Sequence, residues 1–191
     1  QCCQCETDFA HAPTSVLSAA KSSRLEMNMA HAGDIARIKS QEQKLVFVSF
    51  TEADALAIGL AIVRNLEASG KNGLVDVSLW DRQIFSHSMA GANADNADWV
   101  RRKINVVRRF QSSSYRKALE LLDAGRAFET GNGTDPKDYA AAGGGFPIRL
   151  NGGPIIGCVT VSGLPQRDDH NEAVRAIAAH LGLDPAGIAL D

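Results

Sequence analysis

The chain of 191 residues is 45% hydrophobic and 22% charged, which suits one domain that buries a sizeable core together with an appendage. Its 20 basic and 22 acidic residues give a formal net charge of −2, so no global positive field exists to attract nucleic acid or an anionic membrane. No apolar run approaches the roughly 20 residues that a membrane-spanning helix needs, and the sequence starts without the features of a secretory signal. We therefore expect a soluble, cytoplasmic protein that has neither nucleic acid nor membrane as a partner.

Residues 1–32 contain three of the four cysteines, Cys2, Cys3 and Cys5. Cys2 and Cys5 have C-x-x-C spacing, but no second Cys or His pair follows that would complete a tetrahedral zinc site, and the cysteines do not form a disulfide framework. The region shows no sustained hydrophobic period of either kind. We predict a flexible N-terminal extension over residues 1–32 and one folded domain over residues 33–191.

The folded part begins with a short helix around Ile35 and Ile38, followed by an apolar strand over residues 45–50. Thr51 with Asp54 forms a variant of the capping box, which predicts the start of a second helix. That helix ends at Gly70. Its apolar residues recur at helical spacing: Ala55, Ile58, Ile62 and Leu66.

Two alternating runs, residues 74–80 and 84–89, predict a hairpin across a short connection. After Gly91, three residues are candidate helix caps: Asn93, Asp95 and Asn96. The helix that follows carries an apolar stripe of Trp99, Val100, Ile104, Val107 and Phe110. We assign to its polar face the residues Arg101, Arg102, Lys103, Arg108 and Arg109. A further helix, with Tyr115, Leu119 and Leu122 as its apolar residues, runs to Gly125.

A short helix is predicted to start at Pro136, with Asp135 as its cap. Strands at 146–150 and 154–161, the second of which buries Cys158, are joined by Asn151-Gly152, the preferred pair for a type I′ turn. The last helix is capped by Asp168 or Asp169 and ends at Gly182. Because hairpins require antiparallel pairing, we expect an α/β fold of the α+β type, with a mostly antiparallel sheet flanked by helices.

Several motifs in the second half of the chain occur in a fixed order. They are Ala-Asp-Asn96-Ala-Asp-Trp99-Val-Arg-Arg-Lys103, Val-Val-Arg-Arg-Phe110-Gln-Ser-Ser113, Gly-Gly-Gly-Phe-Pro147 and Ser-Gly163-Leu-Pro-Gln-Arg-Asp-Asp169-His170. Together they resemble the haem-degrading, HbpS/GlcG-like domain family, and most closely its branch of small uncharacterised proteins, from about Lys44 to Leu183. The resemblance implies a profilin-like domain that assembles into homo-oligomers. Some relatives bind or degrade haem, although fold does not fix function.

The resemblance and the glycines together indicate a ligand site between two loops and the basic helix, because glycines 143 to 145 allow a flat ligand or another backbone to come close. Guanidinium groups there would bind an anionic ligand such as a propionate or phosphate. The same basic residues would equally suit a solvated face or a subunit contact. The expected ligand-binding residues are Trp99, Arg102, Lys103, Ser113, Gly144, Gly145, Phe146, Pro147, Ser162, Gly163 and His170.

The sequence does not decide which chemistry such a site would perform. An axial haem ligand must be a His, Cys, Met or Tyr, and the candidates beyond the N-terminal extension are His87, Met89, Tyr115, Tyr139 and His170, none of them compelling. Asp169 and His170 are the candidate pair for proton transfer, but a capped helix would show the same spacing. No metal site is predicted. The leading hypothesis is a homo-oligomeric small-molecule-binding protein, with haem as one candidate cofactor; the alternatives are an oligomeric scaffold or an enzyme that uses Asp169 and His170.

Overall fold

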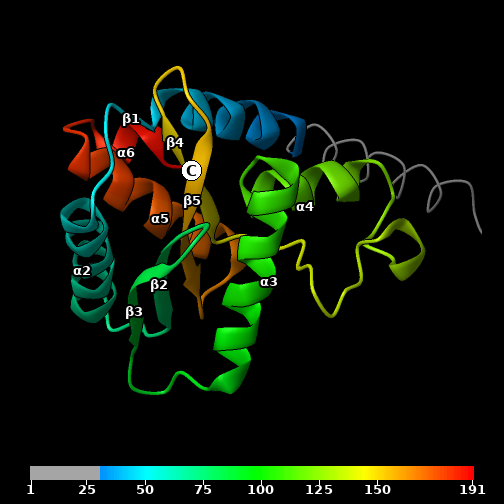
Figure 1. Cartoon of the computed structure of the whole chain (residues 1–191), viewed down its shortest axis with the longest axis horizontal. Helices are drawn as coiled ribbons and strands as arrows, with labels where there is room; N and C mark the ends of the chain where they lie inside the picture. The colour runs from blue at the N-terminus through cyan, green and yellow to red at the C-terminus, as the bar shows by residue number, and fades with distance from the viewer. Residues whose placement is uncertain (1–30) are drawn as a thin grey trace, which may run out of the picture.

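A five-stranded sheet in the order β1-β4-β5-β2-β3 lies at the centre of the computed structural model, which describes residues 31–191 (Figure 1). The predicted flexible extension, with its three cysteines, lies outside this range apart from its last two residues. Only β1 and β4 pair in parallel, so the sheet is mostly antiparallel. The strands are β1 (Val46–Phe47), β2 (Leu74–Leu79), β3 (Gln83–Ser88), β4 (Gly145–Leu150) and β5 (Ile155–Ser162).

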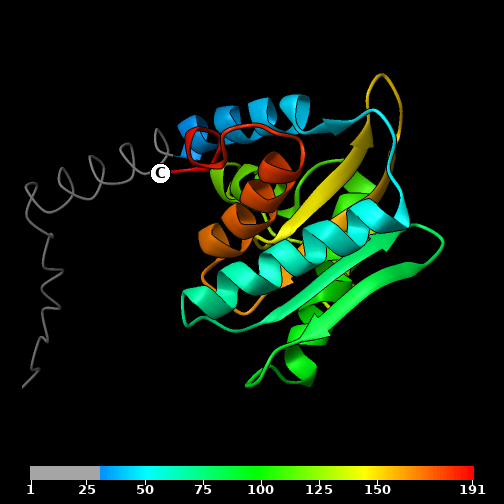
Figure 2. The same cartoon turned by 90° about the vertical axis from the view of Figure 1, so that its left-hand side faces the viewer.

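Helices cover both faces of the sheet (Figures 1 and 2). On one face α2 and α5 lie side by side, and on the other α3 runs across β4 and β5 and leads into α4. Residues 31–44 are also helical. The helices are α2 (Glu52–Ala68), α3 (Ala94–Phe110), α4 (Ser114–Asp123), α5 (Gln166–His180) and α6 (Pro185–Ile188), with a 3-10 turn, η1 (Thr130–Asn132). The predicted single α/β domain with a mostly antiparallel sheet between helices is confirmed.

The two faces of the sheet differ in chemistry because side chains alternate along each strand. The face under α2 and α5 carries the main apolar core, including Val75, Phe146 and Val161. The face under α3 carries small and polar side chains, among them Asp76 and Ser162, which line cavities with α3 residues. The α3 side of the sheet is therefore the one that offers polar groups to a ligand.

Local sequence signals locate most elements correctly. Thr51 and Asp54 form the predicted capping box of α2, and Asn93 with Asn96 forms another at the start of α3. The β2–β3 hairpin is confirmed, and Cys158 is fully buried in β5, where burial raises the pKa of its thiol to about 12. No helix within residues 31–191 is both long and apolar enough to cross a membrane.

Five predictions about individual elements are wrong. The strand expected over residues 45–50 pairs with β4 only at Val46–Phe47. Leu122 is exposed, and its neighbour Leu121 is buried instead. A turn replaces the helix expected at Pro136. The Asn151-Gly152 turn is not type I′, because that type needs positive φ at both residues and only the glycine has it.

The fifth wrong prediction concerns the start of α5. The helix begins at Gln166, after Pro165, and no side chain caps it, so Asp168 and Asp169 lie within its first turn.

Candidate functional site

Two neighbouring cavities lie between α3 and the start of α5, the larger of them extending to α4, and they share Trp99 and Gln166. The larger, here called the large pocket, has a volume of about 750 Å³, and the smaller, the small pocket, about 270 Å³. The two predicted loops do meet here: a Cβ built on Gly143 would lie 1.8 Å from the carbonyl oxygen of Gln166, which follows the Ser162 bend. The cavities therefore lie where the sequence placed a site.

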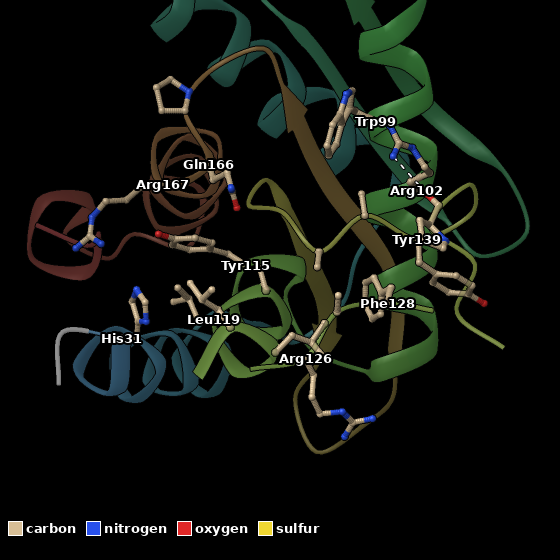
Figure 3. Close-up of a pocket in the computed structure, with 18 residues that line it drawn as sticks. His31, Trp99, Arg102, Tyr115, Leu119, Arg126, Phe128, Tyr139, Gln166 and Arg167 are labelled. Atoms are coloured by element: carbon tan, nitrogen blue, oxygen red, sulfur yellow. Dashed lines mark hydrogen bonds between the residues drawn. The ribbon is translucent and has the colours of Figure 1, made fainter. Parts of the chain in front are cut away.

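Aromatic and aliphatic side chains form the walls of the large pocket (Figure 3). Tyr115 and Leu119 come from α4, whereas Phe128 and Tyr139 come from the segment between α4 and β4. The rings of Phe128 and Tyr139 meet edge to face with centroids 5.9 Å apart. Walls of this kind suit a flat, largely apolar ligand.

Three arginines stand around this apolar surface, and they differ in how strongly they are already paired (Figure 3). The Arg102 guanidinium lies 4.2 Å from the centre of the Trp99 ring, and its Nε is 2.7 Å from the Asp98 carboxylate. Arg167 is held by both carboxylate oxygens of Asp34. Arg126 is exposed and has no ion-pair partner within residues 31–191. Its charge is thus the most available for a ligand.

Potential axial ligands for a haem iron also line the large pocket. They are His31, Tyr115 and Tyr139. Nδ1 of His31 is buried and has no hydrogen-bond partner among the residues that the structure describes. The Tyr139 hydroxyl accepts a hydrogen bond of 3.3 Å from Arg109.

The small pocket contains a buried ion pair. The Lys103 ammonium lies 2.8 Å from Oδ2 of Asp169 and donates a second hydrogen bond of 2.9 Å to the Val161 carbonyl oxygen. Both side chains are almost fully buried, at 3% and 4% exposure. Burial lowers the pKa of Lys103 and raises that of Asp169, and the opposite charge of the partner counteracts each shift.

This position of Lys103 corrects its assignment to the polar face of α3. The helix turns Lys103 toward the sheet together with Val107, one turn later. The backbone makes room for it at Gly144, where a Cβ would lie 2.8 Å from the Lys103 nitrogen and 2.2 Å from the Val161 oxygen. Gly144 has φ +120°, a conformation that side-chain-bearing residues rarely adopt.

The structure brings some of the predicted ligand residues together and leaves others apart. Trp99 and Arg102 line the large pocket; Trp99, Lys103, Ser162 and Gly163 line the small one. The remaining predicted residues line neither: Ser113, Gly144, Gly145, Phe146, Pro147 and His170.

Several residues that line neither pocket make contacts that hold the fold together. Ser113 caps α4, and its backbone N–H donates to the buried Glu42 carboxylate at 2.7 Å. Phe146 belongs to the apolar core on the opposite face of the sheet. Pro147 is paired with Cys158 inside the sheet, and the Gly145 N–H donates to the Ser114 hydroxyl at 2.9 Å.

Asp169 and His170 are not brought together as a catalytic pair. His170 is fully buried, with Nε2 2.9 Å from the Gln41 side-chain oxygen and its ring beside Tyr115 and Phe146. Burial, aided by the positive charge of Arg167, lowers the pKa of His170 to about 3. The Asp169 carboxylate instead faces Lys103 and accepts the Leu164 N–H.

Of the other haem-ligand candidates, His87 is exposed on β3 and Met89 belongs to the core. Sequence reasoning missed His31, which falls in the region predicted to be flexible, and Arg126 and Phe128, which follow the end of α4 without a periodic pattern. Within residues 31–191, no group of three or more His, Cys, Asp or Glu side chains is arranged to hold a metal ion.

Comparison with known proteins gives a consistent pattern. Residues 50–178 match the family described as "Haem degrading protein HbpS-like". A UPF0303 protein of Mesorhizobium japonicum is 51% identical over 162 residues, which cover 85% of this chain and 97% of that protein. A UPF0303 protein of Brucella canis is 52% identical over 157 residues, covering 82% and 92%.

Solved structures with the same fold include two of particular interest. The crystal structure of the Ybr137w protein has a TM-score of 0.73 and 25% identity, covering 84% of this chain and 97% of that one. The structure titled "PduOC:Heme Complex" has a TM-score of 0.59 and 18% identity, covering 69% and 95%. At the lower identity the likeness shows the fold alone.

Proposed function

This chain belongs to the HbpS-like family of haem-degrading proteins, and on that premise we propose that it binds a flat, anionic small molecule, with haem as the leading candidate, in the large pocket. Family membership confirms the resemblance found in the sequence. The ligand is our own inference, supported by the shape and chemistry of the pocket and by the haem complex of a protein that shares the fold.

The dimensions and walls of the large pocket fit a haem-sized ligand. Its volume of about 750 Å³ falls inside the range of roughly 300–1,000 Å³ that is typical of small-molecule sites. The rings of Tyr115, Phe128 and Tyr139 offer apolar surface to a macrocycle (Figure 3). Haem, when bound, would supply the iron, and His31, Tyr115 or Tyr139 is the residue that would hold it.

The observation that carries this proposal is the unpaired Arg126 beside an apolar wall. A haem is apolar except for its two propionates, which need cations at the edge of the pocket. Arg126 has no competing carboxylate in the part of the chain that is described, and Arg102, stacked on Trp99, stands on the other side. Guanidinium groups bind carboxylates with two parallel hydrogen bonds.

Haemin titration tests the proposal. We expect a Soret shift with the wild-type protein, and a Kd about tenfold weaker for Arg126→Ala, as expected for one lost hydrogen bond between charged groups. The matched control is Arg64→Ala, since Arg64 is exposed on α2, across the sheet from the pocket. Absence of a Soret shift, or an equal loss for Arg64→Ala, would refute the assignment.

Single substitutions at the three candidate axial ligands then identify the residue that holds the iron. The variants are His31→Ala, Tyr115→Phe and Tyr139→Phe. Loss of the axial ligand changes the Soret position, whereas loss of a wall residue changes the affinity without moving it. If none of the three moves the band, the iron is held elsewhere.

We also propose that the protein acts as a homo-oligomer, as the family resemblance implies. Light scattering coupled to size exclusion gives the mass of the particle directly. A particle with the mass of a single 20.3 kDa chain would contradict this part of the proposal.

A further inference from the structure

We propose that the small pocket is a second site, in which Lys103 forms a Schiff base with a small aldehyde or ketone. It is a different cavity from the large pocket, although the two share Trp99 and Gln166 as wall residues, and the proposal does not depend on haem binding. The cavity, the buried amine and an adjacent carboxylate occur together in the structure, and together they provide what this chemistry needs.

The first observation is the position of Lys103. Its side chain lines a cavity of about 270 Å³ but is only 3% exposed to solvent. An ammonium group has three N–H donors, and two of those on Lys103 are used, by the Val161 carbonyl and by Asp169. The third has no acceptor among residues 31–191. A ligand oxygen inside the cavity would accept a hydrogen bond from this third N–H group.

The second observation is the wall of the cavity. Trp99 provides apolar surface, and Ser162 and Gly163 also line the cavity. Asn96 is tied to this backbone by a hydrogen bond of 3.3 Å to the Ser162 oxygen. The volume restricts the ligand to a small molecule, and because Asp169 already balances the charge of Lys103, a neutral carbonyl group suits the cavity.

Asp169 supplies the proton transfers that the reaction requires. It takes a proton from the ammonium over 2.8 Å, and the neutral amine attacks the carbonyl carbon to form a C–N bond. Asp169 gives this proton to the former carbonyl oxygen, takes a second proton from the newly bonded nitrogen and passes it to the resulting hydroxyl group, which leaves as water while the C=N bond forms. The lysine ammonium and the carbonyl compound are thus converted into a protonated imine and water, Asp169 ends as the carboxylate, and no oxidant or reductant is needed.

The environment lowers the cost of forming the neutral amine. Burial lowers the pKa of Lys103 below that of an ordinary lysine, and the same burial raises the pKa of Asp169, so both groups are shifted toward their uncharged forms. Lysines that form Schiff bases are typically desolvated in this way. The competing explanation is that the pair only joins α3 to β5 and α5, in which case Lys103 would not react.

Reductive trapping separates these explanations. The wild-type protein is incubated with acetaldehyde, or with acetone as a second probe, and then with sodium borohydride, which reduces an imine to a stable secondary amine. Peptide mapping by mass spectrometry gives the modified fraction at each lysine. We expect Lys103 to be modified several-fold more than Lys137, which is exposed on the surface of the same molecule.

The matched variant is Lys103→Arg, which keeps the positive charge beside Asp169 but cannot form an imine. It should show only the background at exposed lysines. If this variant does not fold, the wild-type map still decides the question. Modification of Lys103 that is no greater than that of Lys137, with both probes, would overturn the proposal and leave the pair a structural contact.

Discussion

Lys103 and Asp169 bear opposite charges and are both almost fully buried. The attraction between them offsets the free-energy cost of removing each charge from water. We predict that Lys103→Met destabilises the protein by about 3–5 kcal/mol, because it leaves the Asp169 carboxylate buried without a counterion. The double variant Lys103→Met/Asp169→Leu should recover much of this loss, since it removes both charges. Urea unfolding of the two single variants and the double variant measures the coupling between the residues.

An exposed ion pair to Asp168, the neighbour of Asp169 on α5, is the control for this cycle. Lys71 lies 3.4 Å from Asp168, and both side chains are far more exposed than the buried pair. Lys71→Met should change the free energy of unfolding by no more than about 1 kcal/mol. Similar changes in the free energy of unfolding for Lys71→Met and Lys103→Met would show that burial does not strengthen the effect of losing the lysine.

His170 provides a prediction about pH. Burial depresses its folded-state pKa to about 3, far below the ordinary value of 6.5, so the unfolded chain takes up the proton first as the pH falls. Its contribution to stability is therefore complete above about pH 6.5 and is lost progressively toward pH 3. Between about pH 7 and pH 5 this amounts to about 2 kcal/mol.

The measurement is the free energy of unfolding of the wild type and His170→Gln at both pH values. The difference between the two proteins should shrink by about 2 kcal/mol at the lower pH, because the variant lacks the titrating group. Comparing proteins removes the contribution of buried carboxyls such as Asp76, whose raised pKa acts in the opposite direction. His87→Gln, at an exposed position, is the control for loss of a histidine.

At the scale of elements, Gly144 allows the start of β4 to pass beside Lys103. We predict that Gly144→Ala destabilises the protein by more than about 2 kcal/mol, since a Cβ would collide with the Val161 oxygen and the φ of +120° would be strained. Gly125→Ala isolates the cost of positive φ, because Gly125 has φ +62° with open space around it. It should cost about 1 kcal/mol by chemical denaturation. Equal costs for the two would contradict the steric argument.

Elements with local signals were predictable from the sequence, and those that depend on distant contacts were not. The capping box at Thr51 and the spacing of Ile58 and Ile62 define α2 without reference to the rest of the chain. In contrast, β1 ends at Phe47 because its partner, β4, offers only two parallel pairings, and β4 lies about a hundred residues further along the sequence. Pairing of this kind leaves no local pattern.

The candidate site was only partly predictable for the same reason. The glycine-rich motifs and Trp99 pointed to the region in which both cavities occur. Residue type then misled the assignment of Lys103 to the polar face of its helix, although its spacing from Val107 is that of a buried position. Its partner, Asp169, is 66 residues away. His170 was misleading in the opposite sense, because a polar motif residue belongs to the core.

At the scale of the whole molecule, the sheet has one face filled by the apolar core and one face that leaves room for a cavity. The α2 and α5 side is filled by the main core. The α3 side carries small and polar strand residues, of which Ser162 lines the small pocket, whereas the large pocket beside it is lined by helices and connecting segments alone. The large pocket joins α3, α4 and the start of α5, so a ligand in it would connect elements that otherwise have few mutual contacts.

We therefore predict that haemin stabilises the whole domain against heat. A ligand that binds only the folded state at about 100 times its Kd adds about 2.7 kcal/mol. For a domain of this size, that corresponds to a rise in Tm of roughly 5–10 °C. Circular dichroism is the appropriate measurement, since haem quenches tryptophan fluorescence. Arg126→Ala should reduce the rise at a fixed haemin concentration, whereas Lys103→Arg should retain it, because Lys103 lies in the other pocket. A rise that vanishes in Lys103→Arg but survives in Arg126→Ala would reverse our assignment of the two cavities.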